Sequence, residues 1–351
     1  MATPEQIIEL RRLAQRWTLQ NPSFDIVDDS ENYLWFTREL QRLLRSADEQ
    51  GRLILPNLRD DNETIAIYSD YGGESPDSRY LTYSFLVCAW NQSEPFTSRM
   101  KEIRAAHGLN DPFKEIAFKD FRYGPIKRAL PDYLSALSNL VNGFLLTVIV
   151  DKNVGTVLGG ETASESKRHV ANILKNEGFG DWKPAVAEKV VVICHFISYL
   201  VALLSKPDQK VFWMTDHDSI AEPAERFERV LDLLQRLLHH YSPHQYALLG
   251  GATPFEEKAP GQMDMLSAPD IVAGALEHYF TRRSKAKSDE PLITEQTNQV
   301  LEWLTGDGVG LKRQTMFIRK CDVGYEVGTI IFSLKEERPD AVYIPVSTKK
   351  A

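Results

Sequence analysis

Aspartates stand at the ends of three stretches whose residue types are typical of β-strands. These stretches cover residues 64–70, 144–151 and 210–216, and they end on Asp70, Asp151 and Asp216. A strand ends at the rim of a sheet, where a charged side chain can reach water and a ligand. For Asp70 the alternative is a purely local role, because aspartate is a common turn residue and glycines follow at 72 and 73.

Two further acids lie in other settings. Glu115 falls beside Lys119 in an alternating stretch, residues 113–124, which suggests a short strand or extended segment. Asp270 follows Pro269 where the sequence predicts the start of a helix, and proline and aspartate both suit a first helical turn. Asp270 is therefore either a site residue or a helix-start residue. Lys119 is either a phosphate contact or a solvated charge.

Carboxylates that gather at one edge of a sheet repel each other and raise each other's pKa unless a cation neutralises them. Ligand sets made only of oxygen suit Mg²⁺ or Mn²⁺, which keep several waters and bind substrate phosphates. Two such ions about 3.5–4 Å apart activate a water and stabilise the leaving oxygen in phosphodiester cleavage. His217, directly after Asp216, is a candidate proton shuttle, with an exposed loop position as the alternative.

The predicted elements around these acids alternate between strands and helices. Two helices are predicted over residues 4–20 and 31–48. A hairpin over residues 64–90 precedes helices near 95–109 and 125–141, and later helices cover about 164–177, 185–204 and 224–240. A polar loop precedes the helix that opens at residues 267–270, and residues 283–292 look like a linker or exposed loop. Residues 152–184 are polar and glycine-rich, which suggests an insertion or lid. This alternation predicts an α/β fold in which helices cover a mixed sheet.

Composition narrows the class of protein. The 351 residues are 43% hydrophobic and carry a formal net charge of −8, as in a soluble globular protein that does not attract nucleic acid over its whole surface. Residues 186–204 are apolar but contain Glu188, Lys189 and His195, so we predict a buried core helix and no membrane span. Three scattered cysteines and the lack of a signal-peptide pattern favour a reducing, cytoplasmic setting.

The order of these features resembles the family called "domain of unknown function 3800", a group of ribonuclease-H-like proteins. The likeness rests on the strand that ends at Asp70, the segment around Glu115, the later strands that end on aspartate, and Ala268-Pro269-Asp270-Ile271-Val272-Ala273-Gly274. It spans about residues 62–282. Two departures stand out: Tyr71 occupies the place of a second acid, for which Glu74 is a possible substitute, and Pro269 replaces the usual alanine.

The resemblance implies a ribonuclease-H-like domain over residues 61–282, with an N-terminal helical extension (1–60) and a C-terminal α+β extension (283–351). It also implies a bacterial or mobile-element origin with a role in defence. We expect metal-dependent cleavage of nucleic acid, in which Mg²⁺ or Mn²⁺ is held by Asp70, Glu115, Asp216 and Asp270, with Asp151 as the rival for the third position. The alternative is an inactive scaffold that binds a protein or nucleic-acid partner through its terminal extensions.

Overall fold

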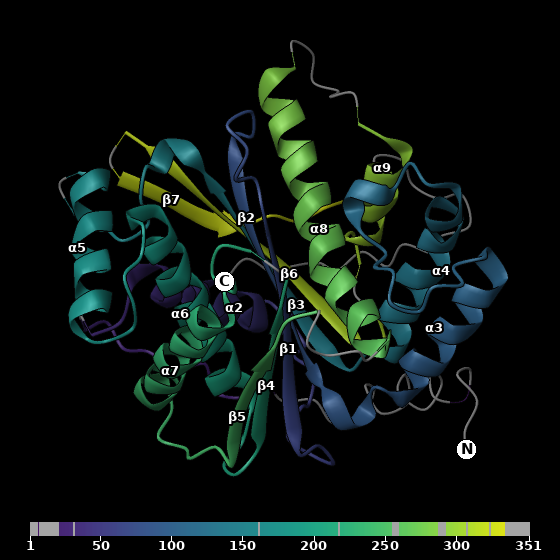
Figure 1. Ribbon diagram of the computed structural model, residues 1–351, viewed down its shortest axis with the longest axis horizontal. Helices are drawn as coiled ribbons and strands as arrows, with labels where there is room; N and C mark the ends of the chain where they lie inside the picture. The colour runs from purple at the N-terminus through teal and green to yellow at the C-terminus, as the bar shows by residue number, and fades with distance from the viewer. Residues whose placement is uncertain are drawn as a thin grey trace.

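One mixed sheet runs through the computed structural model, which describes residue 6 and residues 21–30, 32–160, 162–216, 218–254, 260–286, 293–306, 308–322 and 324–333. In the described residues the sheet has seven strands in the order β5-β4-β1-β2-β3-β6-β7 (Figure 1). The strands are β1 (Thr64–Gly72), β2 (Tyr80–Ala89), β3 (Gly143–Asp151), β4 (Lys210–Thr215), β5 (Leu248–Ala252), β6 (Leu311–Cys321) and β7 (Gly324–Thr329).

The pairing directions explain how acids distant in sequence can meet. Strands β1, β2 and β3 pair antiparallel in succession, as the predicted hairpin requires. Strand β4 lies parallel to β1 on its other side, and β5 lies parallel to β4. The carboxyl ends of β1 and β4 therefore meet at the same edge of the sheet.

Helices cover both faces of the sheet (Figure 1). One face, here called the α8 face, carries α3 (Glu94–His107), α4 (Gly124–Leu140), α8 (Pro260–Lys285) and α9 (Glu295–Trp303). The other, here called the α6 face, carries α2 (Trp35–Glu49), α5 (Ala163–Asn176), α6 (Pro184–Leu204) and α7 (Ala224–Tyr241). The α/β prediction, with a mixed sheet between helices, is confirmed.

Strand β1 divides its side chains between the two cores, since successive residues of a strand point to opposite faces. Ala66 and Tyr68 belong to the core under α8, whereas Ile65 and Ile67 belong to the core under α6. Asp70 has the parity of Tyr68, so its side chain lies on the α8 face.

The α6 helix is the buried core helix that the sequence predicts. Its length and composition alone would suit a membrane span, but 78% of the apolar window is buried inside the structure. Leu200, Val201 and Leu203 have no exposed surface and pack in the core beneath β1 to β3.

Three expectations need correction. Helix α8 begins at Pro260, so Pro269 and Asp270 lie inside the helix and not at its start. Residues 152–184 are not a detached lid, because α5 packs on α6 and Leu174 and Trp182 are buried in the same core. Residues 113–117 form no strand; they are a loop before the short 3-10 helix η2 (Phe118–Asp120).

The two ends of the chain share the central core. β6 pairs with β3 and thereby continues the sheet, and Phe36, Leu40 and Leu44 of α2 belong to the core of the α6 face. The predicted domain boundary after residue 282 falls inside α8. The helix predicted over residues 4–20 lies outside the described residues, apart from residue 6.

Candidate functional site

The positions of the Asp70 and Asp216 side chains follow from the register of the parallel strands β1 and β4. Tyr68 pairs with Met214, and both residues point into the core of the α8 face. Asp70 and Asp216 stand two residues further along their strands, so they lie next to each other on the same face, about 4.8 Å apart in the backbone. Both residues are half-buried.

Helix α8 brings Asp270 to the same place. The helix packs across β1 and β2, and it approaches the end of β1 closely. A Cβ atom on Gly72 would lie 2.7 Å from the Thr82 hydroxyl and 3.9 Å from the Ala273 backbone. The small residues at 72 and 273 therefore let α8 sit low enough over β1 for Asp270 to reach Asp70.

The loop that carries Glu115 is fastened to α8 by polar contacts. The Ile116 N–H donates to Ser267 Oγ at 3.1 Å, and the Phe118 N–H donates to Asp270 Oδ2 at 2.5 Å. The Phe118 ring lies where a side chain on Gly274 would be, since a Cβ there would approach the ring to 2.5 Å. Glu115 directly precedes these two anchored residues, which hold this part of the loop beside Asp270.

A buried ion pair supports this loop from behind. Arg104 of α3 pairs with Asp264 of α8 at 2.5 Å, and both side chains are buried. The same guanidinium donates to the carbonyl oxygens of Asp111 and Lys114 at 3.1 and 2.8 Å. Sequence reasoning missed this pair, because Asp264 falls in a segment predicted as a polar loop and nothing in its spacing points to Arg104.

The electrostatics show that four carboxyl groups act on one another. Burial raises the pKa of Asp70 well above its usual value, and the charges of Asp270, Asp216 and Glu115 raise it further. Burial, Asp270 and Asp216 raise the pKa of Glu115 to about 8. We refer to Asp70, Glu115, Asp216 and Asp270 as the acidic cluster.

Hydrogen bonds partly offset the effect of burial on the pKa of Asp270. Burial raises its pKa to about 6, while the Phe118 N–H and a side-chain hydrogen bond with Asp70 act in the opposite direction. A hydrogen bond between two carboxyl groups needs a proton on one of them, and burial, which raises the pKa of both Asp70 and Asp270, favours the protonated form. The pair therefore keeps a proton where a cation would otherwise supply positive charge.

Lys119 contributes positive charge at the rim of the cluster. Its side chain is exposed, and its charge lowers the pKa of both Glu115 and Asp270. The structure thus places Lys119 near the acids while keeping it open to solvent. A substrate phosphate arriving at the cluster would meet this ammonium group.

Two predicted acids lie elsewhere. Asp151 ends β3, where its carboxylate pairs with Arg79 at 2.9 Å and accepts from the Asn153 N–H at 2.9 Å. Glu74 turns to the α6 face and pairs with Lys189 at 2.5 Å, so it does not replace the second acid that Tyr71 lacks. His217 lies outside the described residues.

The donor chemistry of the acidic cluster fits a hard divalent cation, since every candidate ligand is a carboxylate oxygen. Burial and neighbouring negative charges raise the pKa of Asp70, Glu115 and Asp270, and a bound cation would offset this repulsion. As positioned, however, no three His, Cys, Asp or Glu side chains among the described residues form a group that could hold a metal ion. Binding would therefore need side-chain rotation, starting with the proton-sharing pair of Asp70 and Asp270.

Comparisons with known proteins leave the family open. No family model matches this sequence, and no curated protein matches it. Among solved structures, a chain from the "Structure of the PCNA:RNase HII complex from Archaeoglobus fulgidus" is similar at 13% identity, with 68% of this chain and 87% of that chain covered. The TM-score of 0.32 is too low to establish a common fold.

Proposed function

We propose that this chain is a metal-dependent nuclease with a ribonuclease-H-like domain, which hydrolyses phosphodiester bonds of nucleic acid at the acidic cluster. One observation carries the proposal. Four carboxyl groups from segments up to 200 residues apart gather at one sheet edge, where burial and the neighbouring negative charges raise the pKa of Asp70, Glu115 and Asp270. Structural ion pairs place opposite charges together, whereas a site for a cation and phosphates gathers like charges.

The strand arrangement supports the fold part of the proposal. An antiparallel β1-β2-β3 unit is extended on the β1 side by parallel β4 and β5. Acids at the adjoining ends of β1 and β4, with a further acid on the covering helix, form the arrangement expected of a ribonuclease-H-like nuclease. The additions, α2, β6 and β7, leave this edge in place.

The roles of the residues follow from their positions. Asp70 and Asp270 would hold Mg²⁺ or Mn²⁺ centrally, with Asp216 and Glu115 on either side, and Lys119 would contact a substrate phosphate. When bound, the metal would lower the pKa of a water and offset phosphate charge. The Phe118 N–H fixes one oxygen of Asp270, and so it sets which oxygen remains for the cation.

Two measurements on Asp70→Asn test the proposal. Calorimetric titration of the wild-type protein with Mn²⁺ should show binding, and the variant should lose more than the roughly 10- to 100-fold in affinity that an outer-shell change costs. Cleavage of single-stranded, double-stranded and hybrid substrates in Mg²⁺ should be lost in parallel.

Asp151→Asn is the matched control, because Asp151 also ends a strand but already pairs with Arg79. Its Mn²⁺ affinity should equal that of the wild type. Should Asp151→Asn lose the cation while Asp70→Asn keeps it, the assignment of the acidic cluster would be wrong.

A second candidate function is an inactive ribonuclease-H-like protein that binds nucleic acid or a protein. It is favoured by Tyr71, whose hydroxyl faces Ser69 and Thr215 on the opposite face and so cannot serve as the second acid. Nucleic-acid binding without Mn²⁺ uptake or cleavage would support this candidate over the nuclease.

A further inference from the structure

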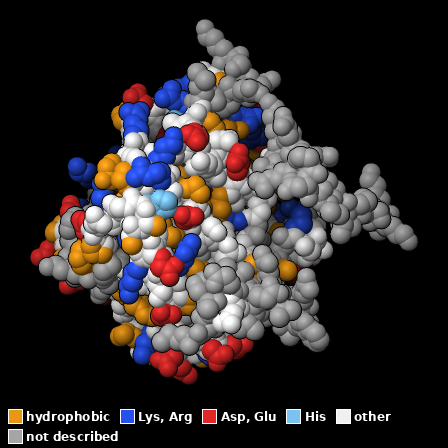
Figure 2. All heavy atoms as spheres, turned by 90° about the vertical axis from the view of Figure 1, so that its right-hand side faces the viewer, with side chains coloured by type: hydrophobic (Ala, Val, Ile, Leu, Met, Phe, Trp, Pro, Cys, Tyr) orange, Lys and Arg blue, Asp and Glu red, His pale blue; other side chains and the backbone are white. Residues whose placement is uncertain are grey.

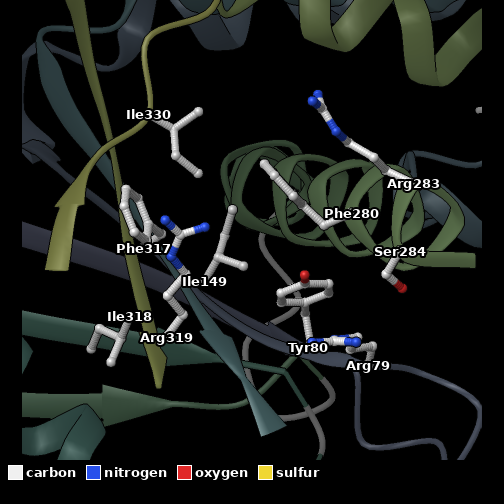
Figure 3. A pocket seen from close by; sticks show the side chains of 10 residues that line it. All are labelled: Arg79, Tyr80, Ile149, Phe280, Arg283, Ser284, Phe317, Ile318, Arg319 and Ile330. Carbon is white, nitrogen blue, oxygen red and sulfur yellow. The ribbon is translucent and has the colours of Figure 1, made fainter. Parts of the chain in front are cut away.

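A cavity of about 550 Å³ opens between the C-terminal part of α8 and strands β2, β3 and β6 (Figure 3). This is within the size range of small-ligand sites. Its lining combines three arginines with three aromatic residues: Arg79, Arg283, Arg319, Tyr80, Phe280 and Phe317. The remaining lining residues are neutral, so the cavity wall itself carries positive charge only.

The aromatic rings and guanidinium groups lie against one another. The rings of Tyr80 and Phe280 meet edge to face with centroids 5.7 Å apart. Arg79 lies 5.8 Å from the Tyr80 centroid, and Arg319 lies 5.4 Å from that of Phe317. Flat rings beside cations suit a ligand with a planar π-system and a negative group.

The three arginines differ in how far they are neutralised. Arg79 pairs with Asp151 and Arg319 pairs with Glu326, but a guanidinium has five donors, more than one carboxylate uses. Arg283 contacts a neutral group, the Tyr279 hydroxyl, at 2.8 Å. Basic residues are favoured in the last turn of a helix, so the positive charge by itself does not indicate a ligand. The aromatic rings beside the arginines are the feature that points to one.

The cavity and the acidic cluster share one face of the sheet and one helix. Phe280 follows Asp270 by ten residues in α8, which is about 15 Å at 1.5 Å per residue. That distance equals four to five stacked nucleotides at about 3.4 Å per phosphate, and fewer in an extended strand. In Figure 1 the C-terminal end of α8 points to the top of the molecule. Figure 2 shows the right-hand side of that view, with several Lys and Arg side chains in its upper part and acidic side chains along its lower edge.

We propose that this cavity binds an unpaired nucleotide of a single-stranded nucleic acid. The base would lie against Tyr80 and Phe280, and the phosphate would be held by Arg283 and Arg319. The proposal rests on the proposed function in one respect: the same strand continues over α8 to the acidic cluster, where it is cut. Aromatic stacking accepts any base, so we expect little sequence preference.

Fluorescence anisotropy in EDTA tests the cavity without cleavage. It measures binding of the protein to fluorescein-labelled oligothymidylate and oligouridylate of ten nucleotides. Phe280→Leu keeps an apolar side chain but removes the ring, and it should raise the Kd at least fivefold. Arg283→Gln combined with Arg319→Gln should raise the Kd at least tenfold and reduce its salt dependence. Circular dichroism checks that each variant is folded.

Arg236→Gln is the matched control, since Arg236 is an exposed, ion-paired arginine on α7, across the sheet. Its Kd should stay within twofold of the wild type. The proposal is overturned if the wild type binds neither oligonucleotide, or if the cavity variants bind as tightly as the wild type. It is also overturned if a polyglutamate peptide binds instead and the same variants lose that binding.

Cleavage measurements separate this inference from the nuclease proposal. If both hold, the cavity variants raise KM for a ten-nucleotide substrate, leave kcat unchanged, and have no effect on a dinucleotide that cannot span the two places. Cleavage with unchanged KM in the cavity variants would reject the inference and keep the nuclease. If the protein cleaves no substrate but binds oligonucleotides, and the cavity variants lose that binding, the inference is kept and the nuclease proposal is rejected.

Discussion

On the α6 face, beside the end of β1, Lys189 lies between two carboxylates, Glu74 and Asp218, at 2.5 Å from each. On the α8 face, beside the same strand end, the acidic cluster holds four carboxyls, and an exposed lysine, Lys119, lies at its rim. Neighbouring residues of β1 point to the two faces. The Tyr71 ring lies on the α6 face, with its centroid 4.8 Å from Lys189 Nζ, and Asp70 lies on the α8 face in the acidic cluster. One face supplies its own cation, and on the other we propose that a metal ion takes this role.

Removing the internal cation should give the largest effect. Lys189→Met leaves Glu74 and Asp218 facing each other beside a buried apolar side chain, and breaking such a pair costs about 3–5 kcal/mol. Because the Glu74 side chain is 58% exposed, we expect the lower end, about 3 kcal/mol, in urea unfolding. Lys175→Met, which removes an exposed pair with Asp181, should cost less than about 1 kcal/mol. Equal losses would mean that burial of Lys189 has no energetic consequence.

Crowding the loop against α8 should have the next largest effect. In Gly274→Ala the added methyl meets the Phe118 ring, and relief of such overpacking costs about 1–3 kcal/mol. The displaced loop would loosen the Phe118 N–H bond to Asp270 and weaken Mn²⁺ binding. Gly250→Ala, whose Cβ meets nothing within 4 Å, should do neither. Unchanged stability in Gly274→Ala would show that the loop moves freely.

The two faces should also differ in pH dependence. In EDTA the folded protein holds protons on Asp70, Glu115 and Asp270 that the unfolded chain releases at lower pH, because the folded pKa values are raised. Stability that is present near pH 5 is therefore lost as the pH rises through about 6 and towards 8. Urea unfolding across this range measures it, and saturating Mn²⁺ should remove the loss. A rise in stability over the same range would contradict the pKa values.

Neutralising one acid of the cluster should give the smallest change, with the opposite sign to Lys189→Met. Asp70→Asn removes a desolvated group that faces like charges, and we expect a gain of about 1 kcal/mol at pH 8 in EDTA. The gain should vanish near pH 5, where Asp70 is protonated in the folded protein. Asp132→Asn, at an exposed acid of α4, is the control and should change little.

The sequence predicts a good part of this site because strand ends and residue parity are local properties. Asp70 and Asp216 follow from two short β-rich runs, and the α/β class follows from alternation. The sequence predicts that a helix starts at Asp270, because proline usually marks a helix start. The helix instead begins at Pro260, since packing of α8 across β1 and β2 outweighs the cost of one interior proline.

The parts that the sequence does not predict depend on contacts between distant segments. The family resemblance is what points to Glu115 as a site residue. Its position depends on two hydrogen bonds, in which Ser267 and Asp270 accept from N–H groups of the loop. Asp151 looks the same as Asp70 in sequence, and only Arg79 distinguishes it. The arginine and aromatic cavity draws on five separate stretches of chain, and Arg283 lies in a segment predicted as a linker.

Pro269 has a consequence for how the acidic cluster could accept an ion. Proline has no N–H, so the Met265 carbonyl, four residues earlier, lacks its usual helical donor, and α8 bends more easily at this point than elsewhere. Asp270 is the next residue. A small pivot of the helix there would swing its carboxylate while the packed turns on either side stay in place, which gives the proton-sharing pair a route to open when a cation arrives.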